Sequence, residues 1–270
     1  MSEEALPELA LTEEEVSEIL RTCDGEALLV GGQALAFWAQ HYQITPLGVL
    51  AQHVTSDADF LGSAATAREL AEALRPHGWR YWPVSMDDAT AQTAKLSKRI
   101  EGEGIKQIDF LGSIIGLATD RIKQRAVVLH LADGTRLQVL HPLDVLESRL
   151  KNLAVLPSKR DRQGVAQAQL AIDIVRSYLE QLIAAGDLRQ LLSAIERVAR
   201  IALDKTLDAV FHEFRLDLLS AVPADRVPSE EFQTRRWPQI REFVAKQRET
   251  HERRRSQLAQ RKKKTRSPKA

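Results

Sequence analysis

The sequence predicts an α/β protein in two parts, a small mixed sheet with flanking helices followed by a helical C-terminal domain. Up to about residue 140, apolar strand patterns alternate with amphipathic helix patterns and turn residues. From Pro142 onward the patterns are helical. A third observation is a stretch that occurs twice, Asp-Phe-Leu-Gly-Ser at 59–63 and at 109–113. Each copy has the composition of a strand that ends in a Gly-Ser turn.

The elements before residue 140 follow from local signals. Thr12 and Glu15 fit a capping box, so a helix should begin there and stop near Gly25. Residues 47–53 are compatible with a short helix or a loop. The other elements are predicted from apolar spacing and from Gly and Pro turns: strand 27–30, helix 33–42, strand 57–61, helix 65–74, strand 79–84, hairpin 94–100 with 105–111, and hairpin 126–131 with 135–140.

The C-terminal part reads as a series of helices. Proline in the first turn after His141 marks the start of the first helix, and Gly186 separates two longer ones. Further helices are expected at 161–184, 188–203 and 205–220 and around Trp237. From about Thr250 the composition is too polar to pack, which predicts a disordered basic tail. The predicted domains are 1–140, 141–250 and the tail 251–270.

Three aspartates are the candidate catalytic residues. Asp57 and Asp59 are two apart on a predicted strand, so both should project from one face. If the strand of the second repeat lies beside the first, Asp109 joins them. Three converging carboxylates repel one another unless a cation lies among them. Their oxygen ligands suit Mg²⁺ or Mn²⁺. The alternative is that Asp57 and Asp59 are exposed acids at a strand end.

Gly31 and Gly32 connect the apolar strand at 27–30 to the next helix. Glycines at this point let the backbone approach a phosphate at the positive end of a helix. Glycines also connect strands to helices in many folds, so a tight turn is the alternative. A dinucleotide-binding domain is a third interpretation, but the third glycine of its motif is missing and no parallel βαβ continuation follows.

Together, the strand, the glycine pair, the helix, Asp57-x-Asp59 and the later Asp109 resemble the nucleotidyltransferase superfamily that includes DNA polymerase beta. The sequence is most similar to the small prokaryotic branch with AbiEii-type toxins and antibiotic adenylyltransferases. The resemblance covers roughly residues 25–160. The segment between Gly32 and Asp57 is longer than in minimal members, and Gln33 replaces the serine often found beside this glycine.

The resemblance implies transfer of a nucleoside monophosphate from an NTP to an acceptor hydroxyl, with pyrophosphate released. By this resemblance, Asp57 and Asp59 would bind both of two metal ions. Asp109 would bind only the ion that activates the acceptor hydroxyl and would take the proton of that hydroxyl. Gly31, Gly32 and Lys151 would contact the nucleotide, although Lys151 also fits a solvated lysine on an amphipathic helix. The acceptor would be tRNA or another RNA, a protein or a small molecule. The toxin-like branch implies a separate antitoxin. The alternative is an inactive module of this fold that binds nucleotide or RNA.

The amino-acid composition also bears on the partners and the cellular location of the protein. Lysine plus arginine (38) nearly balances aspartate plus glutamate (37), but the end from Arg253 is strongly basic, as in segments that bind nucleic acid or only aid solubility. Cys23 is the single cysteine, so no internal disulfide and no cysteine-based zinc site is expected. No apolar run reaches membrane-spanning length, and the N-terminus is acidic where a signal peptide is basic. We therefore expect a cytoplasmic protein with no membrane partner.

Overall fold

A mixed sheet forms the frame of the N-terminal part in this computed structural model, which describes residues 6–25, 27–51, 55, 57–84, 91–131 and 133–266. Within those residues seven strands pair in the order β3-β4-β5-β2-β1-β7-β6. The strands are β1 Leu28–Val30, β2 Ala58–Leu61, β3 Arg80–Pro83, β4 Gln92–Ile100, β5 Gly104–Leu111, β6 Val127–His130 and β7 Arg136–Val139. The predicted mixed sheet and both predicted hairpins, β4–β5 and β6–β7, are confirmed.

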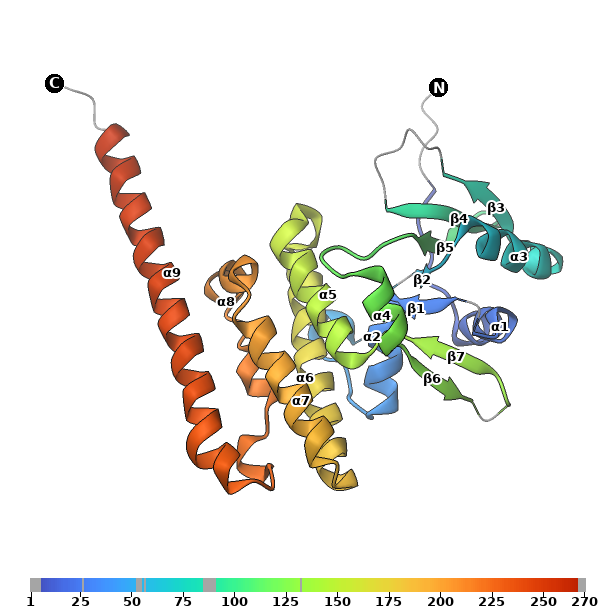
Figure 1. The fold of residues 1–270 in the computed structure, drawn as a ribbon. Coiled ribbons are helices and arrows are strands. Elements are labelled where there is room, and N and C mark those ends of the chain that lie inside the picture. The colour runs from blue at the N-terminus through green and yellow to red at the C-terminus, as the bar shows by residue number, and fades with distance from the viewer. Residues whose placement is uncertain are drawn as a thin grey trace.

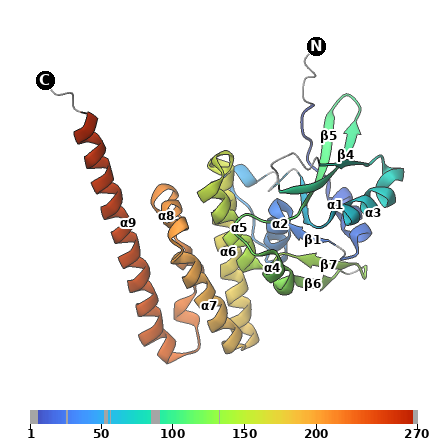
Figure 2. The ribbon, with the colours of Figure 1, turned by 45° about the horizontal axis from the view of Figure 1, so that its top comes forward.

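Helices cover the sheet from two sides (Figures 1 and 2). The helices of this part are α1 Glu13–Cys23, α2 Gly31–His41, α3 Ala64–Leu74 and α4 Thr119–Arg125, with short 3₁₀ turns η1 Gly48–Leu50 and η2 Arg75–His77. Helices α1 and α3 contact each other and strands near the two ends of the sheet, whereas α2 contacts β1 and β2. On its other side α2 meets α5 and α6, so it joins the sheet to the helical part.

The C-terminal part is helical, as predicted. Its helices are α5 Pro142–Val155, α6 Arg162–Ala185, α7 Leu188–Ala202, α8 Asp208–Phe214 and α9 Trp237–Arg266. Short turns join them: η3 Pro157–Lys159, η4 Lys205–Leu207, η5 Leu218–Ala221, η6 Ala224–Arg226 and the π-helical η7 Phe232–Arg236. Helices α5 and α6 lie next to the sheet domain, α7 and α8 follow, and α9 is outermost (Figure 1).

The two copies of the repeat form neighbouring parallel strands in the middle of the sheet. Strand β2 pairs with β5 so that Asp59 lies opposite Asp109 and Phe60 opposite Phe110. Both phenylalanines are fully buried, and their rings stack with centroids 5.6 Å apart. This aromatic pair sets the register of the two strands by filling the core beneath them. A slip of either strand by one residue would move its aspartate to the opposite face and separate the pair.

The structure differs from the predicted elements at three main places. Strand β2 begins at Ala58, so Asp57 lies in the bend before it. The helix predicted at 205–220 is split into η4, α8 and η5, because Arg215 adopts a left-handed conformation (φ 60°) that ends α8 and Asp217 caps η5. Helix α4 was not predicted, since it is polar and buries a single residue, Ile122.

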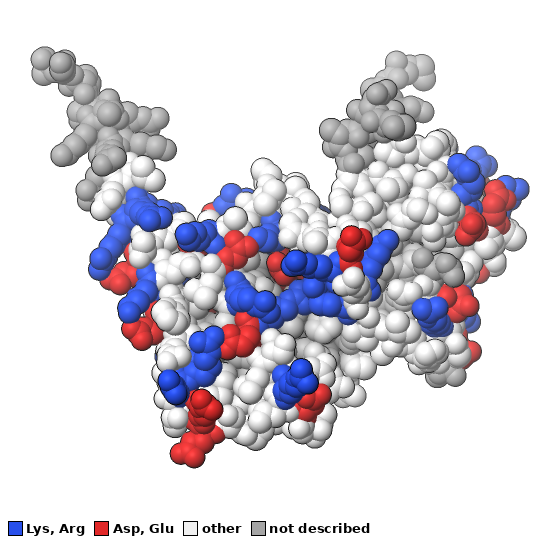
Figure 3. Space-filling model, in the orientation of Figure 1, with Lys and Arg blue, Asp and Glu red and all other residues white. Residues whose placement is uncertain are grey.

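Helix α9 continues through Arg266, where the composition predicted a disordered tail. Arginine, lysine, glutamine and alanine all favour helix, so a chain too polar to pack can still be helical. Residues 252–258 are exposed, which agrees with the expectation that this end makes no core. Figure 3 shows lysine and arginine side chains along this helix. Among the described helices, none has both the length and the apolar character needed to cross a membrane.

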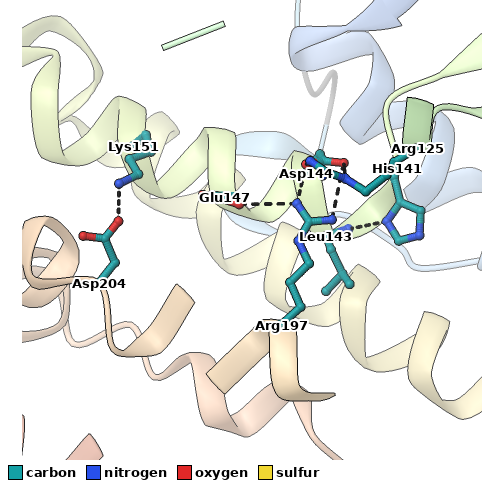
Figure 4. A network of polar contacts seen from close by, with 8 residues as sticks. All are labelled: Arg125, His141, Leu143, Asp144, Glu147, Lys151, Arg197 and Asp204. Atoms are coloured by element: carbon teal, nitrogen blue, oxygen red, sulfur yellow. Dashed lines mark hydrogen bonds and ion pairs between the residues drawn. The ribbon is translucent and has the colours of Figure 1, made fainter. Parts of the chain in front are cut away.

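A buried ion pair ties α4 and α7 to the start of α5 (Figure 4). Asp144 is fully buried and accepts hydrogen bonds from two arginines. Arg125 donates from Nε (3.1 Å) and Nη2 (2.7 Å), and Arg197 donates from both terminal nitrogens. A buried carboxylate shared by two guanidinium groups fixes both arginines and the helices that carry them.

We expect Asp144→Ala to lower the free energy of unfolding by about 3 kcal/mol, the lower end of the cost of breaking a buried ion pair, because Arg125 keeps contact with water. The control is Glu180→Ala, which removes an exposed partner of Arg176 and Arg226 and should cost less than about 1 kcal/mol. Urea unfolding of both variants measures the difference. Equal losses would show that the Asp144 pair does not hold the helices together.

Candidate metal centre

Three aspartates converge beside the central strands of the sheet. Asp57 lies just before β2, Asp59 on β2 and Asp109 on β5. Paired residues of neighbouring strands project from the same face, so the β2–β5 register brings Asp59 and Asp109 together. One carboxylate oxygen of each aspartate lies within 4.8 Å of the others. The three residues can therefore hold a metal ion, and their catalytic role stays a prediction.

Hydrogen bonds fix two of the carboxylates and leave one oxygen without a donor. The Thr55 hydroxyl donates to Asp57 Oδ1 at 2.6 Å, and the Gln92 side-chain amide donates to Asp109 Oδ2 at 2.8 Å. Lys95 Nζ lies 3.9 Å from Asp109 Oδ1, within ion-pair range. Asp109 Oδ1 is buried and accepts no hydrogen bond from the described residues. A buried carboxylate oxygen without a hydrogen-bond donor is unusual in a native fold and suits a metal ligand.

The electrostatics of the cluster favour a cation. Burial, and after it the charge of Asp57, raises the pKa of the Asp59 carboxyl from 3.8 to about 7. Arg149 and a hydrogen bond from the Gly32 backbone N–H oppose this rise. Burial also raises the pKa of Asp109. These shifts mean that the acids resist being charged together, and a divalent cation among them would remove that cost.

The glycine pair forms the first turn of α2 and packs directly on the acids. Gly31 has a φ of 63°, and a Cβ added there would lie 1.7 Å from Asp59 Oδ2. A Cβ on Gly32 would lie 2.4 Å from Thr55. Only glycine permits this approach of the helix N-terminus to the carboxylates. The Gly32 N–H donates a hydrogen bond to Asp59 in the structure, and contact of both glycines with phosphate stays a prediction.

Arg149 on α5 is a site residue that the sequence interpretation missed. Its positive charge acts on both Asp57 and Asp59. Its Nη1 donates to Gln167 Oε1 at 3.3 Å, while its Nε is buried and has no hydrogen-bond partner within the described residues. Burial lowers the pKa of this guanidinium, and the two aspartates raise it. Arg149 is therefore a half-buried arginine that lies near the acidic cluster, with an Nε–H donor that has no partner among the described residues.

A sequence signal for Arg149 was available. It falls between Leu146 and Leu153 on the buried side of α5, at the helical spacings i+3 and i+4. A charged residue on the apolar stripe of an amphipathic helix requires a polar partner inside the fold. Lys151 is two residues further, about 200° around the helix, and so faces elsewhere.

Lys151, the predicted nucleotide contact, is held by the helical part in this structure. Its ammonium group pairs with Asp204 and donates to the Thr206 hydroxyl at 2.8 Å. Among the described contacts of Lys151, none joins it to the three aspartates. Its proposed role at the triphosphate remains a prediction.

Glu8 is a second residue near the site that the sequence interpretation did not single out. The segment around it runs beside the start of β5, where the Leu9 N–H donates to the Ile105 carbonyl at 2.9 Å and the Ile105 N–H to the Pro7 carbonyl at 2.9 Å. Burial raises the pKa of Glu8, and so do the charges of Asp57 and Asp109. A non-local strand contact of this kind leaves no local sequence pattern.

Comparisons with known proteins add little. No family model matches the chain, and no curated protein matches it. Among solved structures, the chain is similar to the Megavirus polyadenylate synthase, with 14% sequence identity and a TM-score of 0.38. The similar region covers 66% of this chain and spans 37% of that protein. A likeness this distant carries no conclusion about this chain, so its function has to be inferred from the residues of the site.

Proposed function

We propose that this chain is a metal-dependent nucleotidyltransferase, which moves a nucleoside monophosphate from an NTP to a hydroxyl group. The observation that carries the proposal is the convergence of Asp57, Asp59 and Asp109 beside the glycine start of α2. Displacement at phosphorus requires a cation-binding group for the phosphate charge and a base for the attacking hydroxyl. Acids that can hold a cation beside a helix N-terminus meet both needs. The acceptor would be RNA, a protein side chain or a small molecule.

The residues of the site fit Mg²⁺ or Mn²⁺. All three candidate ligands are carboxylates, the oxygen donors that these cations prefer. Asp109 Oδ1 has no hydrogen-bond donor, and the three acids have no cation within hydrogen-bond distance among the described residues. When bound, a divalent cation would supply Lewis-acid stabilisation of the attacking and leaving oxygens.

Asp109 is the proposed base. The acceptor oxygen forms a bond to the α-phosphorus, the bond between that phosphorus and the β,γ-diphosphate breaks, and pyrophosphate leaves. The proton of the acceptor hydroxyl passes to the carboxylate of Asp109, whose Oδ1 accepts no hydrogen bond from the described residues. Gln92, through its hydrogen bond to Oδ2, holds the carboxylate in place.

Arg149 is proposed as the cation that offsets triphosphate charge, in competition with Lys151. We expect Arg149→Met to lower kcat/KM for nucleotide transfer by at least about tenfold, because it removes a preorganised positive charge from the site. Lys151→Met, a matched change on the same helix, should lower it much less, since Lys151 is paired with Asp204. Steady-state kinetics of both variants decides between them. A larger loss in Lys151→Met would return the role to the lysine predicted from the sequence.

The test of the function is labelling of cellular RNA or protein from each of the four α-³²P NTPs, with Mg²⁺ or Mn²⁺ present. We expect label transfer and release of pyrophosphate. Asp57→Ala and Asp59→Ala should each abolish the signal, while Asp225→Ala, at an exposed acid of η6, should retain it. Transfer that persists in both site variants would exclude the mechanism.

The same assay tests the alternative, an inactive module that binds nucleotide or RNA. Two features are compatible with it: Gln33 stands where the family often has serine, and the Gly32 N–H already bonds Asp59. Absence of transfer with every NTP, together with tight RNA binding, would favour this alternative. A toxin role and an antitoxin partner, which the resemblance implies, remain part of the proposal.

A further inference from the structure

A second polar site lies on the opposite side of α5 from the acidic cluster. It is a cavity of about 580 Å³ between α4, α5, α6 and α7. Glu147 on α5 lines this cavity, whereas Arg149 is about 200° further around the helix and acts on the aspartates. The loop around Gly116 closes one side. The cavity is therefore separate from the proposed catalytic site.

The carboxylates at the cavity are already paired. Asp144 is fully buried behind the wall and binds Arg125 and Arg197. Arg197 Nη2 also donates to Glu147 Oε2 at 3.3 Å. Figure 4 shows Arg197 and Arg125 reaching Asp144 from different elements. Two of the lining arginines are thus held rigidly, which lowers the entropy lost when they bind a further anion.

Two more arginines give the cavity an excess of positive charge. Four arginines line it against two carboxylates, Glu147 and Asp204, and the latter is paired with Lys151. With Lys151 and the buried Asp144 included, five cationic side chains face three carboxylates, so an excess of two positive charges remains. Arg121 and Arg200 are exposed and form no ion pair with other described residues. They supply this excess at the solvent side.

Neutral donors complete the lining. His141 accepts the Leu143 N–H at Nδ1, and burial lowers its pKa to about 4, so it adds no charge at neutral pH. The Tyr178 hydroxyl accepts a weak hydrogen bond from the Gln190 amide at 3.4 Å, and Ser193 adds another hydroxyl. Arginine forks together with hydroxyl and amide groups are the donors that proteins use for phosphate.

We propose that this cavity binds the phosphodiester backbone of single-stranded RNA. A polyanion is favoured over a single phosphate because the basic surface extends beyond the cavity: Figure 3 shows a band of lysine and arginine side chains over α4 and α5, with more on α9. On α9 the exposed run Arg253, Arg254 and Arg255 continues this charge. The choice of RNA rests on the proposed function, in which RNA is one acceptor. The binding itself requires no transfer chemistry.

Fluorescence anisotropy with a short labelled single-stranded RNA tests the proposal. Each phosphate contact adds about 0.7 to the salt slope of the binding constant, so Arg121→Ala/Arg200→Ala should make the slope shallower by about 1.4 and binding at about 0.1 M salt roughly 20-fold weaker. Arg189→Ala/Arg235→Ala removes the same charge from exposed positions outside the cavity and should change binding little. Circular dichroism and thermal unfolding check that the variants fold.

Each other outcome has a defined meaning. Equal weakening in both double variants, or weakening only in Arg253→Ala/Arg254→Ala, would overturn the proposal. Displacement of the RNA by pyrophosphate or ATP at matched phosphate concentration would assign the cavity to a small phosphorylated ligand and overturn it too. Asp225→Ala, at an exposed acid of η6, should bind RNA like the wild type. Suppose that neither the wild type nor any variant transfers a nucleotide, while Arg121→Ala/Arg200→Ala still weakens RNA binding. In that case the transferase proposal fails and the proposal of RNA binding stands.

Discussion

Asp59→Asn is expected to abolish tight Mn²⁺ binding and, at the same time, to stabilise the metal-free protein above neutral pH. Loss of one carboxylate ligand should weaken the binding of Mn²⁺ by more than about 100-fold. This exceeds the loss of affinity expected when only a partner of a ligand is removed. The stability gain arises because the folded protein holds the Asp59 proton to a higher pH than the unfolded chain does. Its pKa is raised from 3.8 to about 7, chiefly by burial and by Asp57.

The sign of the pH dependence follows from that shift. Between pH 3.8 and about 7 the folded state binds more protons than the unfolded state, so the wild type should lose stability as pH rises through this window. The loss is at most about 4 kcal/mol, and less where water and Arg149 screen the charge. Asparagine cannot ionise, so the variant should show a flatter profile.

Urea unfolding with a chelator present, from about pH 5 to pH 8, measures this difference. Titration of free Mn²⁺ by electron paramagnetic resonance measures the metal affinity. Asp225→Asn, which changes an exposed acid of η6, is the control and should alter neither quantity. Parallel pH profiles for Asp59→Asn and the wild type would mean that burial and Asp57 do not raise the pKa of Asp59 in the folded protein. Unchanged Mn²⁺ affinity would remove the metal site.

Gly31→Ala is expected to disrupt the acidic cluster more than any other single methyl group added to the sheet domain. The new Cβ would lie 1.7 Å from Asp59 Oδ2, and the residue has a φ of 63°. In the alanine variant, the left-handed conformation should lower the free energy of unfolding by about 1–2 kcal/mol, and the overpacking by roughly another 1–3 kcal/mol. To relieve the clash, Asp59 has to leave its position, so Mn²⁺ binding and nucleotide transfer should both be lost.

Gly48→Ala separates the two causes. Gly48 has a similar φ of 59°, but an added Cβ would meet nothing within 4 Å. This control should lower the free energy of unfolding only by the conformational part, about 1–2 kcal/mol. It should keep Mn²⁺ binding. Thermal unfolding and Mn²⁺ titration of both variants provide the comparison. If Gly31→Ala keeps its metal affinity, the close approach of α2 to Asp59 is not needed for the site.

Much of the fold could be predicted from the sequence because its signals are local. The capping box at Thr12 is present, with the Glu15 N–H donating to the Thr12 hydroxyl at 3.2 Å. The helix predicted at 161–184 is α6, which begins at a side-chain cap from Asp161 and ends at a left-handed Gly186. Caps, turns and apolar spacing each lie within a few residues, so no knowledge of distant contacts is needed.

The candidate site could be predicted in part. Asp57, Asp59 and Asp109 were found through their spacing and the repeated stretch, and the structure brings them together. Arg149 was missed, because the family resemblance implied a lysine on this helix and so pointed to Lys151 rather than to a charge within the apolar stripe. Glu8 was missed for a different reason: its position depends on the pairing of its segment with Ile105, almost a hundred residues away.

The sequence by itself determined the local conformations, the polar composition of the C-terminal end and the presence of acids at two-residue spacing, since each depends on neighbouring residues alone. Only the tertiary structure decided that β2 and β5 are parallel neighbours in register, that α5 turns Arg149 toward the acids and that Asp144 gathers two arginines beside a cavity. Strand order and helix rotation are set by packing between distant segments.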